Sequence, residues 1–227
     1  MCMIWNNTKF KVSKGLAFYA EKESVYFSEE AKKGWQLTHI NPLGFYKFKK
    51  ASEEESTWVI DFYDGRKQDV DDYVGLYEDA GWQLVVNYRN RYFVFKTVED
   101  VVFNYTDKET YKERLRKETK WMMLQSLWVA IPSLILLLMI TFQKSIKINV
   151  MLKAFLSGGL SAGIIFPLLM CVLLIYFKIV YRKRLELFNS PKELGKSQRF
   201  FRDLVITMII GGVIGFIFGI VTSLILY

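Results

Sequence analysis

Three long apolar segments without a charged residue occupy the second half of the chain. Residues 121–142, 154–177 and 204–227 contain no Asp, Glu, Lys, Arg or His. At about 1.5 Å rise per residue, a helix of such length crosses a hydrocarbon core of about 30 Å. The alternative is a buried helix of a globular core, but three such runs in sequence favour membrane spans. The pattern therefore predicts an all-α membrane domain over residues 121–227, with three transmembrane helices at these positions.

In the first half of the chain, apolar residues recur at the spacings of short strands and of amphipathic helices. In residues 57–63 the large apolar side chains recur at every second position, which is typical of a strand. Residues 70–77 carry apolar side chains at helical spacing, and Gly81 follows as a helix terminator. The same reasoning predicts further elements: strands at 9–13, 35–40, 45–50, 82–88 and 91–97, and a helix at about 20–33.

An internal repeat organises these elements. Gly-Trp-Gln-Leu occurs at residues 34–37 and again at 81–84, and at the same offset Phe45–Lys49 falls on Tyr92–Lys96. The repeats extend over about 9–50 and 57–97, and each has the order β-α-β-β. We therefore expect an α+β soluble domain over residues 1–107, built as a tandem β-α-β-β repeat with antiparallel sheet.

This order of motifs resembles an uncharacterised family of Firmicute membrane proteins that carry a duplicated Gly-Trp domain before a few spans. The residues that carry the resemblance are Lys33–Trp35, Phe45–Lys49, Trp58–Asp61, Tyr73, Glu78–Trp82 and Phe93–Lys96. Genes of that family often lie beside PadR-like repressors. The resemblance implies a role in an envelope-stress or antimicrobial response, and it supplies no functional residue.

Charge is distributed unevenly between the halves. Residues 1–107 hold 14 Lys+Arg and 17 Asp+Glu, whereas residues 108–227 hold 17 and 6. The positive charge lies in a juxtamembrane helix at 108–120 and in the loop 178–203, so it does not indicate nucleic-acid binding. The positive-inside rule predicts that both segments and the N-terminus are cytoplasmic, and that the C-terminus lies outside a bacterial cytoplasmic membrane.

The basic residues of these two segments are expected at the membrane interface, either as a topology signal or as contacts with anionic lipid. They are Arg114, Arg116, Lys117, Lys120, Arg182, Lys183, Arg184, Arg199 and Arg202.

Small residues lie along one face of two predicted spans. Gly159 and Gly163 are four residues apart, as are Gly211, Gly215 and Gly219. Such faces let helix backbones approach closely. They predict either packing among the three helices of one chain or a homo-oligomer or membrane-protein partner.

Four aromatic residues of the repeat are candidates for a ligand or partner surface. Tyr46, Phe48, Phe93 and Phe95 lie on the last strand of each copy. They either line a groove between the copies or form the second face of the sheet.

The sequence offers no constellation for chemistry. His39 is the only histidine, Cys2 and Cys171 are the only cysteines, and no phosphate-binding, calcium-binding or nucleophile motif is present. We expect no catalytic residue, no metal and no cofactor. The favoured hypothesis is a non-enzymatic regulatory or accessory membrane protein whose cytoplasmic domain binds a partner protein or small ligand. The alternative is an oligomeric transport component assembled through the glycine-rich helix faces.

Overall fold

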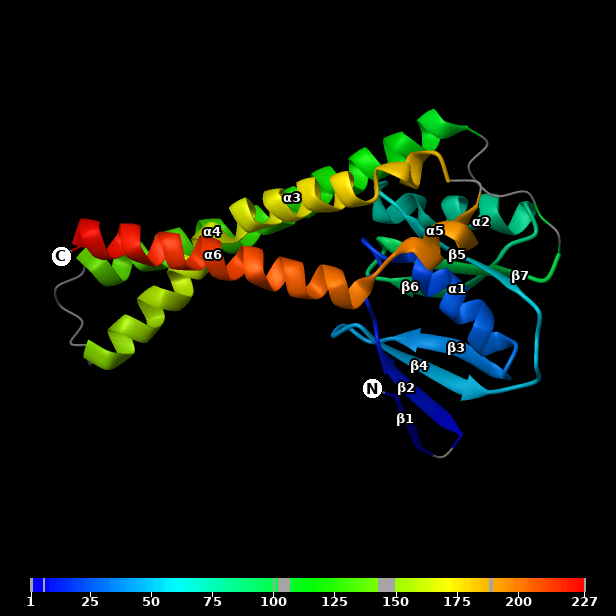
Figure 1. Ribbon diagram of the computed structural model, residues 1–227. Helices are drawn as coiled ribbons and strands as arrows, with labels where there is room; N and C mark the ends of the chain where they lie inside the picture. Colours follow the sequence, from blue (N-terminus) through cyan, green and yellow to red (C-terminus); the bar gives the residue numbers. More distant parts are fainter. Residues whose placement is uncertain are drawn as a thin grey trace. The chain divides into compact units, whose positions relative to one another are not determined.

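The chain folds into two compact units. The computed structural model describes residues 2–5, 7–99, 101, 107–142, 150–187 and 190–226 (Figure 1). The first unit contains Met1–Glu118 together with Lys183–Phe200, and the second contains Thr119–Arg182 and Phe201–Tyr227. A segment between the second and third apolar helices is therefore part of the first unit.

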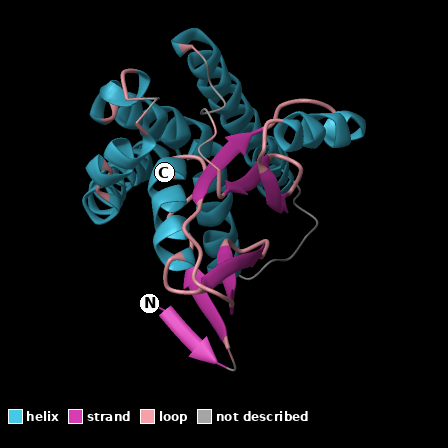
Figure 2. Ribbon diagram, turned by 90° about the vertical axis from the view of Figure 1, so that its right-hand side faces the viewer, coloured by secondary structure: helices cyan, strands magenta, loops and turns pink. Residues whose placement is uncertain are grey.

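Two antiparallel sheets form the framework of the first unit (Figure 2). The strand order is β1-β2-β4-β3 in one sheet and β5-β7-β6 in the other. The elements of the first repeat are β1 Cys2–Trp5, β2 Thr8–Val12, α1 Ala20–Ala31, β3 Trp35–Ile40 and β4 Phe45–Lys50. Those of the second repeat are β5 Thr57–Phe62, the 3₁₀ turn η1 Lys67–Asp69, α2 Val70–Asp79, β6 Gln83–Tyr88 and β7 Tyr92–Thr97. The expected antiparallel α+β fold is confirmed, and β1 is an additional strand that the sequence did not predict.

Both sheets use the same strand register. After Leu37 in the first sheet and after Leu84 in the second, the pairing shifts at the equivalent place. The equivalent pairs are Gln36–Lys49 with Gln83–Lys96, and Leu37–Phe48 with Leu84–Phe95. The sequence offset of 47 residues therefore relates the β3–β4 pairing of the first sheet to the β6–β7 pairing of the second.

A glycine with positive φ follows the helix of each repeat. Gly34 and Gly81 have φ values of 73° and 83°, which an L side chain rarely adopts. At Gly34 a Cβ atom would also lie 2.7 Å from the carbonyl oxygen of Ala51. Glycine therefore ends both helices and directs the chain into the following strand.

The layers of the repeat region alternate between sheet and helix. Phe27 of α1 contacts Tyr46 on the first sheet and Trp58 on the second, so α1 lies between them. On the other face of the second sheet, Tyr77 of α2 stacks on Phe95 with ring centroids 3.9 Å apart. The order is first sheet, α1, second sheet, α2, from the foot of Figure 1 upward.

Two further segments complete the first unit. The helix α3, Lys108–Phe142, begins here and continues as a single helix into the apolar region. After the apolar helix α4, the chain forms the 3₁₀ turn η2 Arg182–Leu185 and the helix α5 Pro191–Ser197. The helix α5 packs on α1 so closely that a Cβ atom on Gly195 would lie 2.9 Å from the carbonyl oxygen of Glu21. The region that the sequence predicted as a loop over 178–203 is therefore largely helical.

The second unit consists of helices long and apolar enough to cross a membrane. These are α3, α4 Val150–Val180 and α6 Phe200–Leu226. The protein is accordingly a multi-pass membrane protein, as the sequence predicted. Within this unit, Asp203 of α6 accepts hydrogen bonds from the hydroxyls of Tyr176 of α4 and of Tyr181, the residue that follows α4.

Candidate functional site

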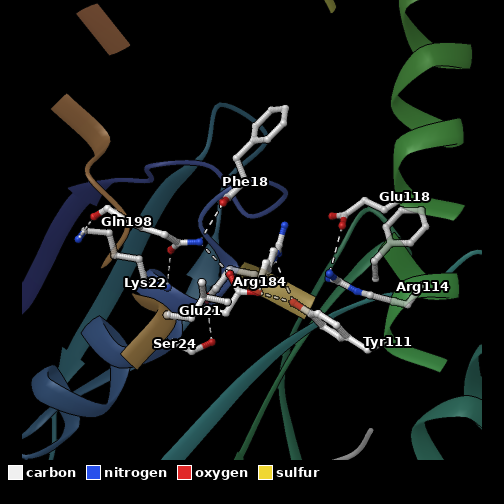
Figure 3. Close-up of polar contacts among 12 residues, drawn as sticks. Phe18, Glu21, Lys22, Ser24, Tyr111, Arg114, Glu118, Arg184 and Gln198 are labelled. Atoms are coloured by element: carbon white, nitrogen blue, oxygen red, sulfur yellow. Dashed lines mark hydrogen bonds and ion pairs between the residues drawn. The ribbon is translucent and has the colours of Figure 1, made fainter. Parts of the chain in front are cut away.

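A buried cluster of charged and tyrosine side chains lies inside the first unit (Figure 3). We call it the polar cluster. Its charged members are Glu21, Asp61, Arg114, Glu118 and Arg184. They come from α1, β5, α3 and η2, so the cluster joins the repeat region to the two segments that lead into apolar helices.

Helix α3 presents its contribution along one face. Asp107 caps the helix, because its carboxylate accepts the backbone N–H of Thr110 over 2.7 Å and the Thr110 hydroxyl over 2.8 Å. From that start, Tyr111, Arg114 and Glu118 follow at spacings of three and four residues, which places them on the same side.

Glu21 and Arg184 form one half of the polar cluster. Oε1 of Glu21 accepts from Nε of Arg184 at 2.9 Å and lies 2.8 Å from its Nη2. The Tyr111 hydroxyl donates to the same oxygen over 2.7 Å. The Glu21 side chain is only 10% exposed, so this ion pair is largely shielded from water.

Gln198 connects this half to the backbone of α1. Its Nε2 donates to Oε2 of Glu21 at 3.0 Å and to the carbonyl of Phe18 at 3.2 Å, while its Oε1 accepts the backbone N–H of Lys22. The Lys22 ammonium in turn donates to the carbonyl of Gln198 over 2.6 Å. These reciprocal bonds hold the end of α5 against the first turn of α1.

Arg114 is at the centre of the other half. Its Nε donates to Oδ1 of Asp61 over 3.3 Å, and its Nη1 lies 3.1 Å from Oε2 of Glu118. Asp61 also accepts from the hydroxyls of Tyr73 and Tyr77, over 2.7 and 2.6 Å. Asp61 therefore ties α2 and α3 to the strand β5.

The pKa values reflect the pairing of these buried groups. Burial opposes ionisation of Glu21, but Arg184 and the Tyr111 hydrogen bond outweigh it, so the pKa of Glu21 is lowered. Burial and the neighbouring Asp61 carboxylate raise the pKa of Tyr73. Glu21 is thus a carboxylate and Tyr73 a hydrogen-bond donor at neutral pH.

The polar cluster suits a structural junction better than a reaction centre. Three carboxylates face two guanidinium groups, and Asp61 and Glu21 each accept several hydrogen bonds. Buried pairs of this kind contribute little net stability, but loss of one partner costs about 3–5 kcal/mol, because the other charge is left without compensation. Loss of one member would therefore leave an opposite charge buried without its partner.

Two members of the polar cluster were expected at the membrane interface. Arg114 is 7% exposed, and the Arg184 side chain is 15% exposed. The interface expectation is wrong for these two, because each guanidinium is held by buried carboxylates. Arg116, Lys117, Lys120, Arg182, Lys183, Arg199 and Arg202 are exposed.

The expected aromatic surface is also wrong. Tyr46, Phe48, Phe93 and Phe95 are fully buried, at 0% exposure. Their strands lie in layers that are covered by α1 and α2, so these side chains form the core.

The glycines expected to mediate helix packing differ in their surroundings. At Gly163 a Cβ atom would collide with the Ser133 side chain of α3, so this glycine allows α3 and α4 to approach each other. At Gly159 and Gly215 a Cβ atom would meet nothing within 4 Å, and at Gly211 it would only touch Leu169. The position Gly219 is exposed on α6.

Sequence reasoning overlooked the polar cluster, although a signal was present. Asp61 stands in an otherwise apolar strand, and a buried carboxylate requires partners. Tyr73 and Tyr77 lie four residues apart on the following helix, and Arg114 and Glu118 show the same spacing. These patterns indicate a buried polar face.

Comparison with known proteins gives one match. Residues 19–127 match a family described as "Protein of unknown function (DUF2812)". The matched region includes Glu21, Asp61, Arg114 and Glu118 and ends before Arg184. No curated protein and no solved structure matches the chain.

Proposed function

We propose that the protein is a non-enzymatic regulatory or accessory membrane protein. In this proposal the α+β unit binds a partner protein or a small ligand, and the polar cluster passes that event to the membrane helices. The observation that carries the proposal is that the start of α3, residues 108–118, and the segment Lys183–Phe200 both belong to the first, α+β unit. Each continues directly along the chain into an apolar helix.

The electrostatics of the polar cluster support such a role. A partner that shifts α1 or β5 slightly would change the distance from Glu21 to Arg184 or from Asp61 to Arg114. Interactions between buried charges depend steeply on such distances, since water screens them little. The two connecting segments would then lose or gain a strong contact, and this change would couple the α+β unit to the membrane helices.

The charge distribution supports a cytoplasmic location of the α+β unit. Exposed basic residues flank the places where the chain passes from one unit to the other. The positive-inside rule favours these places on the cytoplasmic side of a bacterial membrane, with the C-terminus outside. The family resemblance adds the expectation that the signal is an envelope stress or an antimicrobial compound.

A transport component is the second candidate. It is favoured by Gly159 and Gly215, where the backbone is open to a neighbouring helix. It is disfavoured by the three apolar runs, which carry no Asp, Glu, Lys, Arg or His, because ion-coupled transporters usually need such a residue.

The proposal can be tested by crosslinking the tagged full-length protein in its native membrane and identifying what is recovered. Three chains are compared at equal abundance: wild type, Arg184→Gln, and Lys183→Gln as a control that removes a neighbouring exposed charge. We expect a defined membrane partner with wild type and Lys183→Gln, and at least a several-fold lower recovery with Arg184→Gln. Recovery of the chain alone from wild type, together with solute flux in proteoliposomes, would favour the transport candidate instead.

A further inference from the structure

The outer face of the first sheet carries exposed and half-buried side chains. Along β4 the side chains alternate, so that Tyr46 and Phe48 face α1 whereas Phe45, Lys47 and Lys49 face the other way. Their antiparallel partners on β2 are Val12, Phe10 and Thr8. We call these six residues the outer sheet face. Val12 is 50% exposed and Phe45 is 39% exposed, in a part of the chain that the structure describes throughout.

The equivalent face of the second sheet is buried. The strand pairing makes Trp58, Ile60 and Phe62 of β5 equivalent to Thr8, Phe10 and Val12 of β2. In the second sheet these three residues are at most 5% exposed, and Trp58 packs edge to face on Phe27 of α1. Within one chain, this face of the second sheet therefore packs against α1, the helix of the first repeat.

The helix α2 has an exposed face at the opposite end of the layers, as judged from the residues that the structure describes. Four carboxylates and one leucine are exposed on it, and Gly75 between them would leave room for a Cβ atom, with nothing within 4 Å. Leu76 is 71% exposed. We call this surface the outer helix face; its residues are Asp71, Asp72, Gly75, Leu76, Glu78 and Asp79.

We propose that the outer sheet face of one copy binds the outer helix face of a second copy. The stack of first sheet, α1, second sheet and α2 ends in an exposed sheet face on one side and an exposed helix face on the other. Joining the two ends would continue the same alternation, with α2 on the next copy's first sheet as α1 lies on the second sheet. The proposal is independent of the polar cluster.

The charges of the two faces are complementary. The outer sheet face carries Lys47 and Lys49 and no carboxylate, whereas the outer helix face carries four carboxylates and no basic residue. Apolar contacts are also matched, because Phe10, Val12 and Phe45 can pack around Leu76. Copies of one membrane protein share one orientation, so these units lie on the same side of the bilayer. The contact is heterologous and generates either a closed ring or an open chain of copies.

Bismaleimide crosslinking of introduced cysteines in native membranes tests whether the outer sheet face of one copy contacts the outer helix face of another. In a background with Cys2→Ser and Cys171→Ala, one tagged chain carries Lys49→Cys and a differently tagged chain carries Asp71→Cys. A short bismaleimide crosslinker is applied after coexpression. We expect a crosslinked product that contains both tags, and at least a tenfold weaker product when either variant is expressed alone.

Charge reversal separates the proposed contact from a loss of folding. For this test the two tagged chains carry Thr8→Cys and Asp79→Cys, so that the crosslinked thiols are not the charged groups under test. Lys47→Glu with Lys49→Glu in the first chain, and separately Asp71→Lys with Asp72→Lys in the second chain, should each reduce the mixed bismaleimide product several-fold. Coexpression of these two double variants should restore it, because each then meets the opposite charge. Lys33→Glu with Lys108→Glu is the control of equal charge change, and it should leave crosslinking unchanged.

Four outcomes would overturn the proposal. They are an equally strong Lys49→Cys homodimer, the absence of the mixed product while the protein remains folded by circular dichroism, failure of coexpression to restore crosslinking, and capture of a different protein in place of a second copy.

Discussion

The pair of Glu21 and Arg184 provides a quantitative test of the polar cluster. Replacing Arg184 by Met removes two contacts of 2.8 and 2.9 Å to one carboxylate oxygen. Glu21 would stay buried, with the hydrogen bonds from Tyr111 and Gln198 as partial compensation. We expect the free energy of unfolding of the first unit to fall by about 3 kcal/mol, the lower end for a broken buried pair.

A double-mutant cycle shows whether the loss of stability comes from the Glu21–Arg184 pair itself. Glu21→Gln alone should cost a similar amount, because Arg184 is then left without its main carboxylate. The double variant should cost much less than the two single losses combined, with a coupling energy of about 2–3 kcal/mol. Lys183→Met removes the adjacent exposed charge and should change stability by less than about 0.5 kcal/mol.

Urea unfolding of the detergent-solubilised full-length protein can measure these differences. Tryptophan fluorescence follows the first unit, because Trp58 and Trp82 are buried there. Acid provides a second readout. The folded pKa of Glu21 lies below the ordinary value of 4.5, so its contribution is complete above pH 4.5 and is lost as pH falls through the folded pKa. Additive losses, or a cost below about 1 kcal/mol for Arg184→Met, would refute the reasoning.

Three further predictions concern other parts of the protein. Burial raises the pKa of Glu23, so ionisation of this group opposes folding. The contribution of Glu23 to stability is complete below pH 4.5 and is lost as pH rises through its folded pKa, so Glu23→Gln should exceed wild type in stability at pH 7 but not at pH 4 in the same urea assay. Gly195→Ala should destabilise the unit by about 1–3 kcal/mol because its Cβ would press on backbone atoms of Glu21, whereas Gly75→Ala, with open space in a helix, should be neutral or stabilising by up to about 1 kcal/mol in the same measurement. A reporter fused to the C-terminus should be active only outside the cytoplasm, and activity restricted to the cytoplasm would contradict the proposed orientation.

Local periodicity was sufficient to predict most of the fold. The repeat around Gly34 and Gly81, the antiparallel strands and the three apolar helices all depend on spacing within short windows of sequence. The equal register of the two sheets follows from the same residues, since Leu37 and Leu84 precede the shift in each.

The rest depends on contacts between distant segments. Arg114 and Arg184 lie among exposed basic residues, so their charge alone indicated a membrane interface. Their burial is decided by Asp61 and Glu21, which are 53 and 163 residues away along the chain. The core positions of Phe93 and Phe95 likewise follow from α2 lying over the second sheet, which strand alternation cannot reveal.

The helix α5 and strand β1 were missed for a related reason. Pro191–Ser197 is short and mostly polar, and its stability comes from packing on α1 and from Gln198. The strand β1 gains its structure by pairing with β2. Neither segment has a periodic pattern long enough to identify it.

Hydrogen exchange of the full-length protein in lipid nanodiscs tests most directly whether the polar cluster joins the repeat region to both connecting segments, the start of α3 and Lys183–Phe200. The measurement compares backbone amide protection in wild type, Arg184→Gln and the control Lys183→Gln. We predict that Arg184→Gln lowers protection together in α1, in the first turns of α3 and in Pro191–Ser197, while Lys183→Gln leaves all three unchanged. Loss of protection confined to the residues around position 184, with α1 and α3 as in wild type, would contradict the account.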